Sequence, residues 1–281
     1  MDQDLQLSDL HFERLRTIIH DQTGITIGEG RKTLLVSRLR KRLRETGMND
    51  FRAYVARLGT EPAEMQELID RVTTNKTYFH RTPRVWDHFR TVAVEDFLSR
   101  APGRAMRIWS AAASTGEEAH TAGIVLEDVR RSREGFDYRI LGTDISARVI
   151  RSAEAGVFDA AMVSQFRKER PELARAFLTG DDATGYRTTP QITSRISFRL
   201  HNLQNRLAKA APFDVVFLRN VLIYFTPEDQ QVILGHVLAL MRPEGTLYIG
   251  ESETITRLTT DFDIVEPMVY RPRRRPGNHD A

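Results

Sequence analysis

The sequence predicts an α/β protein in which a doubly wound, mainly parallel sheet follows a small all-α domain. A length of 281 residues corresponds to about two domains of ordinary size. Apolar residues from 8 to about 72 recur at helical spacing with no convincing strand, whereas the chain after about 104 repeats a pattern of strand, glycine turn and helix. We therefore predict a helical N-terminal domain with its linker over residues 1–82 and a larger α/β domain over residues 83–281.

The composition is that of a globular protein. Lysine and arginine number 41 against 38 acidic residues, which gives a net charge of +3, and 41% of residues are hydrophobic. Cysteine is absent, which excludes a disulfide framework, a cysteine-ligated metal and a cysteine nucleophile. No apolar run approaches 18 residues and the first residues are acidic, so neither a membrane span nor a signal peptide is expected. We expect a cytoplasmic protein, and the small net charge argues against a dedicated nucleic-acid binder.

The N-terminal part is expected to begin with two helices. Ser8 can cap a helix that ends near Gly24, and a second helix should span about residues 31–44, which hold seven basic side chains and no acidic one. At 100° per residue, one side of the second helix carries Leu35, Val36, Leu39 and Leu43, and the other carries Arg38, Arg40, Lys41, Arg42 and Arg44. The basic side is either a solvated helix face or a docking surface for nucleic acid, anionic lipid or an acidic protein helix.

The α/β part contains four clear strands, at residues 107–112, 138–143, 213–218 and 245–250. The third is an almost unbroken apolar run, which is typical of a strand covered on both faces. Ser146 and Thr226 are placed to cap the helices that follow the second and third strands. Between about 157 and 200 the alternation stops, and residues 186–189 and 196–200 are expected to form small antiparallel strands of an inserted subdomain. Residues 272–281 are expected to be a disordered basic tail.

Acidic side chains follow the first two strands, where ligands bind in doubly wound sheets. The small residues 112–116 allow a close backbone approach and precede Glu117 and Glu118, and Asp144 ends the second strand. The glycines and lysine of a phosphate cradle are missing, so a ligand with a cationic end is favoured over ATP or a dinucleotide. Asp144 could accept hydrogen bonds from ribose hydroxyls. S-adenosylmethionine meets both requirements, although acids at a helix start and in a turn can also be purely structural.

Two further polar segments are candidates for the same site. Arg219 and Asn220 follow the third strand, where burial without partners would be costly, so a cleft is the simpler explanation. Residues 75–81 form a polar and aromatic cluster between the two domains, which can equally be linker and interface packing. The eight histidines show no metal-ligand spacing, and no Ser–His–Asp or paired-carboxylate arrangement can be identified. We therefore expect no metal.

Five motifs occur together in one order. They are Asn75-Lys-Thr-Tyr-Phe-His-Arg81, Arg107-Ile-Trp-Ser-Ala-Ala-Ala-Ser-Thr-Gly-Glu-Glu118, Thr143-Asp-Ile-Ser146, Arg219-Asn-Val-Leu-Ile-Tyr-Phe225 and Ile249-Gly-Glu-Ser-Glu253. This combination resembles the CheR-type chemotaxis receptor methyltransferases over about residues 8–270. The resemblance implies a class I S-adenosylmethionine-dependent methyltransferase domain with a small helical N-terminal domain and a small antiparallel β insertion. Lys76 and His80 stand where the family pattern has Glu and Phe, and Glu251 replaces a frequent His.

The resemblance also implies an activity, protein-glutamate O-methylation. Members of the family transfer a methyl group from S-adenosylmethionine to glutamate side chains of chemoreceptors and leave S-adenosylhomocysteine. Carried across by position, the implied cofactor-binding residues are Asn75, Thr77, Arg81, Glu117, Glu118, Asp144, Asn202, Leu203, Arg219 and Asn220. Arg81 and Tyr224 would face the substrate carboxylate.

The partner that the resemblance implies is the cytoplasmic domain of a methyl-accepting chemoreceptor, in a chemotaxis array or a related signalling array. The basic residues Arg38, Arg40, Lys41 and Arg42 would meet its acidic surface, with the enzyme recruited to membrane receptors without inserting into the membrane. Two other functions stay open on the sequence alone. An RNA methyltransferase would use the same cofactor and the basic helix as a nucleic-acid surface. A non-catalytic signalling module would keep the fold only to bind partners.

The implied chemistry places few demands on the protein. A glutamate side chain has a pKa of about 4.3, so near pH 7 it is already an ionised nucleophile and needs no strong general base. The enzyme has to hold the carboxylate oxygen, the methyl carbon and the sulfur in line.

Overall fold

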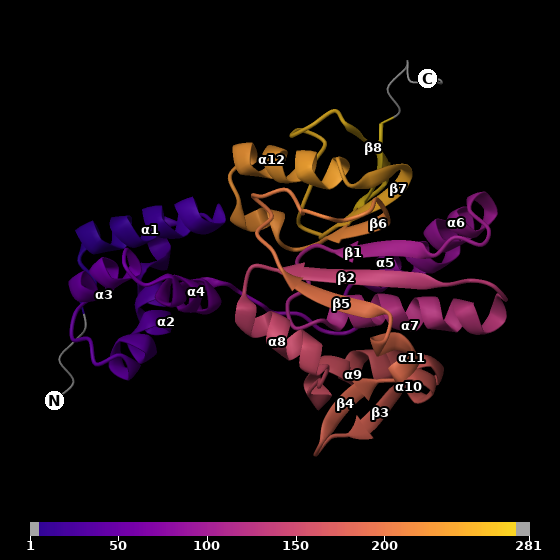
Figure 1. Cartoon of the computed structure of the whole chain (residues 1–281), viewed down its shortest axis with the longest axis horizontal. Coiled ribbons are helices and arrows are strands. Elements are labelled where there is room, and N and C mark those ends of the chain that lie inside the picture. The colour runs from indigo at the N-terminus through magenta and orange to yellow at the C-terminus, as the bar shows by residue number, and fades with distance from the viewer. Residues whose placement is uncertain (1–5, 274–281) are drawn as a thin grey trace.

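The computed structural model describes residues 6–273 and contains a small helical part beside a larger α/β part (Figure 1). The elements of the helical part are α1 (Asp9–Thr23), the 3-10 helix η1 (Glu29–Arg31), α2 (Lys32–Glu45), α3 (Phe51–Leu58) and α4 (Pro62–Val72). Ser8 accepts a hydrogen bond from the His11 N–H, and Gly24 ends α1 in the left-handed conformation with φ 73°, as predicted.

The apolar face of α2 is confirmed, but one side of its basic face is not free. Leu35, Leu39 and Leu43 are at most 2% exposed, and burying each stabilises the domain by about 1.5–3 kcal/mol. Arg42 Nε and Nη2 donate to the two carboxylate oxygens of Glu64 at 2.8 and 2.6 Å, and Glu64 is 1% exposed. At 100° per residue Arg42 lies only about 20° from Leu35. The prediction that Arg42 belongs to the outward side of the helix is therefore wrong.

The α/β part is built on a seven-stranded sheet in the order β5-β2-β1-β6-β7-β9-β8 (Figure 1). The strands are β1 (Met106–Ser110), β2 (Tyr138–Asp144), β5 (Ile196–Leu200), β6 (Phe213–Leu218), β7 (Met241–Ile249), β8 (Phe262–Glu266) and β9 (Val269–Pro272). The first five pair in parallel, and β9 runs antiparallel to both β7 and β8. Every residue of β6 is buried, as its apolar run predicts. The predicted mainly parallel sheet is confirmed.

Helices precede and connect the strands of this sheet. They are α5 (Pro83–His88), the π-helix η2 (Phe89–Ala93), α6 (Val94–Arg100), α7 (Glu117–Ser132), α8 (Ala147–Ala155) and α12 (Pro227–Leu238), with η3 (Leu222–Tyr224) before α12.

The connections reverse direction in the middle of the sheet. The chain passes from β1 through β2 to β5 in one direction and from β6 to β7 in the other. Right-handed crossovers therefore put α7 and α8 on one face and α12 on the other. The reversal lies between β1 and β6, which is where such sheets bind ligands.

The insertion between β2 and β5 agrees with the prediction only in part. It contains α9 (Ala160–Glu169), α10 (Pro171–Phe177), β3 (Leu178–Asp181), β4 (Gly185–Thr188) and α11 (Pro190–Thr193). Strands β3 and β4 pair antiparallel, which confirms the small antiparallel sheet. Residues 196–200 instead form β5, parallel to β2, so that part of the prediction is wrong. Ile196 and Phe198 pack on the main core while Ser197 and Arg199 are exposed, and this alternation is typical of any half-covered edge strand.

The C-terminal tail is described only at its start. Pro272, which we expected to be disordered, is the last residue of β9, and Arg273 Nε donates to Asp263 Oδ1 of β8 at 2.7 Å. Residues 274–281 of the predicted tail lie outside the described part of the chain. Within residues 6–273, no helix is long and apolar enough to cross a membrane.

Candidate active site

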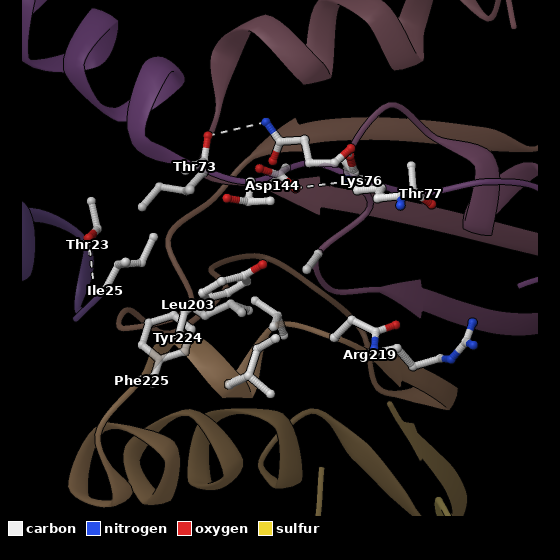
Figure 2. Close-up of a pocket in the computed structure, with 18 of the residues that line it drawn as sticks. Thr23, Ile25, Thr73, Lys76, Thr77, Asp144, Leu203, Arg219, Tyr224 and Phe225 are labelled. Atoms are coloured by element: carbon white, nitrogen blue, oxygen red, sulfur yellow. Dashed lines mark hydrogen bonds between the residues drawn. The ribbon is translucent and has the colours of Figure 1, made fainter. Parts of the chain in front are cut away.

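A cavity of about 390 Å³ lies at the carboxyl ends of β1, β2 and β6, between the two parts of the molecule (Figure 2). Its size is in the range of small-molecule sites, and its place is the reversal point of the sheet. The predicted residues that line it are Asn75, Thr77, Arg81, Glu118, Asp144, Asn202, Leu203, Arg219, Asn220 and Tyr224. From the predicted receptor surface, Arg38 also lines the cavity, whereas Arg40, Lys41 and Arg42 do not. Together with Arg38, the fold thus brings six separate segments of the chain to this cavity.

A nearly buried ion pair joins Glu118, at the start of α7, to Arg219, directly after β6. Arg219 Nη1 lies 3.0 Å from Glu118 Oε2, and the two side chains are 2% and 12% exposed. Ser110 Oγ donates to Glu118 Oε1 at 2.7 Å, and Arg219 Nη2 donates to the carbonyl oxygen of Arg81 at 2.8 Å. Burial raises the pKa of the Glu118 carboxyl, and the charge of Arg219 opposes this rise. The pair supplies the cavity with a carboxylate that suits a cationic ligand group.

Glu117 does not line the cavity, although it precedes Glu118 in the chain. Its side chain is 2% exposed, and both carboxylate oxygens accept from Thr115 Oγ1, at 2.8 and 2.7 Å. Burial raises the pKa of this carboxyl. Consecutive helical residues point about 100° apart, and of these two neighbouring acids only Glu118 lines the cavity. Glu117 therefore stabilises the start of α7, and Glu118 is the acid of this pair that can contact a ligand.

Asp144 holds the two loops that form one side of the cavity. Its Oδ2 accepts from the Ser114 N–H at 2.9 Å and its Oδ1 from the Ser146 N–H at 3.0 Å. Burial raises the pKa of Asp144, and these backbone hydrogen bonds oppose the rise. The turn role and the ligand role are compatible, because each carboxylate oxygen has a second lone pair. Gly116 ends the same loop with φ 101°, and a Cβ there would lie 3.1 Å from the Ala153 side chain.

The linker between the domains forms another side of the cavity. Ser114 Oγ donates to the carbonyl oxygen of Asn75 at 3.1 Å. Arg81 Nη1 donates to the Lys76 carbonyl at 3.2 Å, and its guanidinium carbon is 5.9 Å from the centre of the Tyr78 ring. Asn75, Thr77 and Arg81 all line the cavity, so this cluster is part of the site rather than linker packing alone.

The N-terminal domain supplies a wall that sequence reasoning missed. Thr23, Ile25, Thr26, Ile27 and Leu34 line the cavity. The Thr26 N–H donates to the carbonyl oxygen of Tyr224 at 2.8 Å, and Asn202 Nδ2 donates to the carbonyl oxygen of Gln22 at 2.9 Å. Figure 2 shows Tyr224 and Phe225 between Ile25 and the part of the site that holds Arg219. No local motif marks residues 23–27, because their role depends on how the two domains dock.

Comparison with known proteins agrees with this geometry. The family model described as CheR methyltransferase, SAM binding domain, matches residues 75–270, and the CheR methyltransferase all-alpha domain matches residues 10–73. A chemotaxis protein methyltransferase of Klebsiella aerogenes is 36% identical, over 96% of this chain and 92% of the relative. The chemotaxis protein methyltransferase of Escherichia coli K12 is 32% identical, over 96% and 93%. That of Salmonella typhimurium is 33% identical, over 96% and 92%.

The chain belongs to the CheR methyltransferase family. Its domain over residues 75–270 is therefore an S-adenosylmethionine-binding methyltransferase domain. The lining suits that cofactor, because the cavity contains two carboxylates, Glu118 and Asp144, which would hold an amino group and ribose hydroxyls, and the apolar side chain of Leu203. Within residues 6–273, no group of three or more histidine, aspartate or glutamate side chains is placed to hold a metal.

Two departures from the CheR pattern have different structural consequences. Lys76 is exposed and lines the cavity, so it adds a positive charge near its opening. His80 is 3% exposed, and its Nδ1 lies 2.9 Å from Glu169 Oε2 of α9. Burial lowers the pKa of His80, so the pair works as a polar contact in a position where the family pattern has an apolar ring.

Asp144→Asn removes one negative charge from the cavity and keeps the side-chain size. We expect S-adenosylhomocysteine to bind about 10- to 100-fold more weakly, because a hydrogen bond to a charged group contributes about 1.5–3 kcal/mol. Isothermal titration calorimetry measures this change. The matched control is Asp137→Asn, just before the other end of β2. Equal affinities in the two variants would mean that Asp144 only organises the turn.

Proposed function

We propose that this CheR-family protein transfers the methyl group of S-adenosylmethionine to glutamate side-chain carboxylates of chemoreceptors and forms glutamyl methyl esters. The observation that carries the proposal is a cavity that combines two kinds of side chain. Glu118 and Asp144 offer carboxylates for the cofactor, whereas Arg81 and Tyr224 offer a cation and a phenol that suit an anionic acceptor. The relatives named chemotaxis protein methyltransferases support a receptor as the acceptor.

The proposed reaction needs an oriented carboxylate rather than a base. When bound, S-adenosylmethionine supplies a methyl group on a positive sulfur, which an ionised carboxylate can attack directly. Arg81 has five N–H donors, of which one binds the Lys76 carbonyl, so others can hold the acceptor. Tyr224 adds a neutral hydrogen bond. Holding an acceptor in this way can supply about 7–11 kcal/mol of a barrier. His201 also lines the cavity, and burial lowers its pKa to about 4, so its ring is neutral near pH 7.

The proposal is tested by transfer of a labelled methyl group to cytoplasmic fragments of chemoreceptors, with RNA in a parallel reaction. We expect label on the receptor that mild alkali releases as methanol, since a carboxyl methyl ester is labile to alkali. Alkali-stable label on RNA would contradict the proposal and make the chain an RNA methyltransferase. Cofactor binding without label on any receptor would contradict the choice of acceptor.

Arg81→Ala should lower the methylation rate by about 100-fold or more, because it removes the cation that orients the acceptor. The affinity for S-adenosylhomocysteine should change by less than about tenfold, since Glu118 and Asp144 remain. Tyr224→Phe should lower the rate by about tenfold. The control is Arg84→Ala, whose side chain is 61% exposed. Steady-state methylation and calorimetry separate the two effects, and equal rates in Arg81→Ala and Arg84→Ala would remove Arg81 from the acceptor site.

The proposed receptor surface is the basic side of α2 without Arg42, which Glu64 holds, and it extends from the opening of the cavity over Arg38, Arg40, Lys41 and Arg44. Arg38 lines the cavity, and Lys41 lies one helical turn further on the same side. Arg38 also donates to the carbonyl oxygens of Val72 and Thr73, so it helps to hold the linker. An acidic receptor helix is the partner that this charge favours, and it would bring the enzyme to membrane receptor arrays.

The charge of this surface is best reversed at exposed positions. Lys41→Glu with Arg44→Glu should raise the KM for a receptor fragment about five- to tenfold at low salt, and less at high salt, with unchanged cofactor affinity. Lys41 is 80% exposed. Arg42→Glu would instead put a second carboxylate against the buried Glu64, leave it only Arg57 at 3.7 Å, and cost about 3–5 kcal/mol of stability. Lys168→Glu with Arg175→Glu, exposed on α9 and α10, is a control of equal charge change. Equal KM values for both double variants would restore the solvated-face interpretation.

A further inference from the structure

The turn after β7 places a carboxylate against the backbone of a cavity loop. Glu253 Oε2 accepts from the N–H groups of Asn220 and Gly250, at 2.8 and 2.5 Å. Its Oε1 accepts from the N–H groups of Val221 and Leu222, both at 2.8 Å. We propose that Glu253 is a positioning residue whose carboxylate fixes residues 219–224, the loop that brings Arg219 and Tyr224 into the cavity.

The loop backbone is shaped to surround an anion. Asn220 has φ 58° and Val221 has φ −127° and ψ −33°, so a left-handed residue precedes one close to the right-handed region. Successive N–H groups in such a sequence point to one side and form a concave anion site. The side chain that fills this site is Glu253. A neutral amide there would turn an N–H₂ group toward backbone donors, and these donors would lose their acceptor.

Gly250 allows this close approach. A Cβ at position 250 would lie 2.5 Å from Glu253 Oε2 and 2.8 Å from the Asn220 nitrogen. The Glu253 N–H also donates to the Gly250 carbonyl oxygen at 3.1 Å and closes the turn. Because β6 and β7 are paired neighbours, the turn after β7 and the loop after β6 lie at the same edge of the sheet. The two therefore form one rigid unit held by a single side chain.

The loop that Glu253 holds has a fixed contact at each end. Arg219, at its start, pairs with Glu118, and the carbonyl oxygen of Tyr224, at its end, accepts from the Thr26 N–H. Without the carboxylate, the backbone between these contacts has no internal acceptor for three N–H groups. The side chains of Arg219 and Tyr224 then lose the backbone support that fixes their position. A displaced Arg219 is expected to weaken cofactor binding whatever the acceptor is. The consequence of a displaced Tyr224 rests on the proposed glutamate methylation.

The test compares Glu253→Gln with Glu251→Gln, which changes the same residue type two positions away at 57% exposure. Glu253→Gln should weaken S-adenosylhomocysteine binding about tenfold, lower kcat for receptor methylation about 10- to 100-fold, and speed hydrogen exchange of the amides at 220–222. Glu251→Gln should match the wild type within about twofold. A purely structural role would lower the melting temperature of Glu253→Gln but leave its ligand affinity, measured well below that temperature, unchanged.

Wild-type affinity and exchange in a folded Glu253→Gln variant would overturn the proposal. If that variant does not fold, Gly250→Ala takes its place, because the added methyl group displaces the Glu253 oxygen; unchanged affinity and exchange would again overturn the proposal. Calorimetry and hydrogen exchange need no receptor. A wild-type protein that fails to methylate receptor fragments would therefore contradict the proposed function, while the loss of ligand affinity in Glu253→Gln would still support the positioning role.

Discussion

The ion pair between Glu118 and Arg219 is the contact on which the geometry of the site depends. Removing one partner of a buried pair leaves the other charge uncompensated, at a cost of about 3–5 kcal/mol. Arg219 also donates to the carbonyl oxygen of Arg81, so a single guanidinium connects the start of α7, the end of β6 and the linker. These segments are distant in sequence and meet only because β1 and β6 are neighbours at the reversal point of the sheet. The strand order therefore places the ion pair, and the ion pair places the linker that carries Arg81.

The cavity is complete only when the two domains are docked. Besides the contacts of Thr26 and Gln22, Gln66 Nε2 donates to the carbonyl oxygen of Ile145 at 3.1 Å, and the Arg148 N–H donates to Asp70 Oδ2 at 3.1 Å. The second contact places an acid of α4 at the start of α8. A ligand that contacts both domains stabilises their docked arrangement by the free energy of those contacts. By the same amount, docking makes the free energy of ligand binding more favourable. The N-terminal domain is thus part of the binding site as well as the proposed receptor surface.

The strand-end rule explains why much of this site could be predicted from sequence. Asp144 ends a strand, and Glu118 and Arg219 follow strands, that the apolar pattern marks clearly, and parallel strands end at one edge. The same pattern could not separate Glu118 from Glu117, because side-chain direction within one helical turn is decided by packing. It could not show that Arg42 would reach Glu64, because these two residues lie on different helices and are 22 positions apart in the sequence. The four donors of Glu253 are backbone groups, which every sequence contains, so only the fold reveals that they converge.

Charge also distinguishes how the two partners of the proposed reaction would be held. Arg81 attracts an acceptor only while it is a carboxylate, and a methyl ester is neutral, so this attraction ends with the transfer. Glu118 and Asp144 line the cavity. In the proposed binding mode they would hold the amino group and the ribose hydroxyls of the cofactor, which the reaction leaves unchanged while the sulfur loses its positive charge. The transfer therefore removes the charge that Arg81 would attract and leaves the groups that Glu118 and Asp144 would hold. An enzyme that releases the neutral ester and keeps its basic face on the proposed acidic surface can reach a second carboxylate on that surface without dissociating.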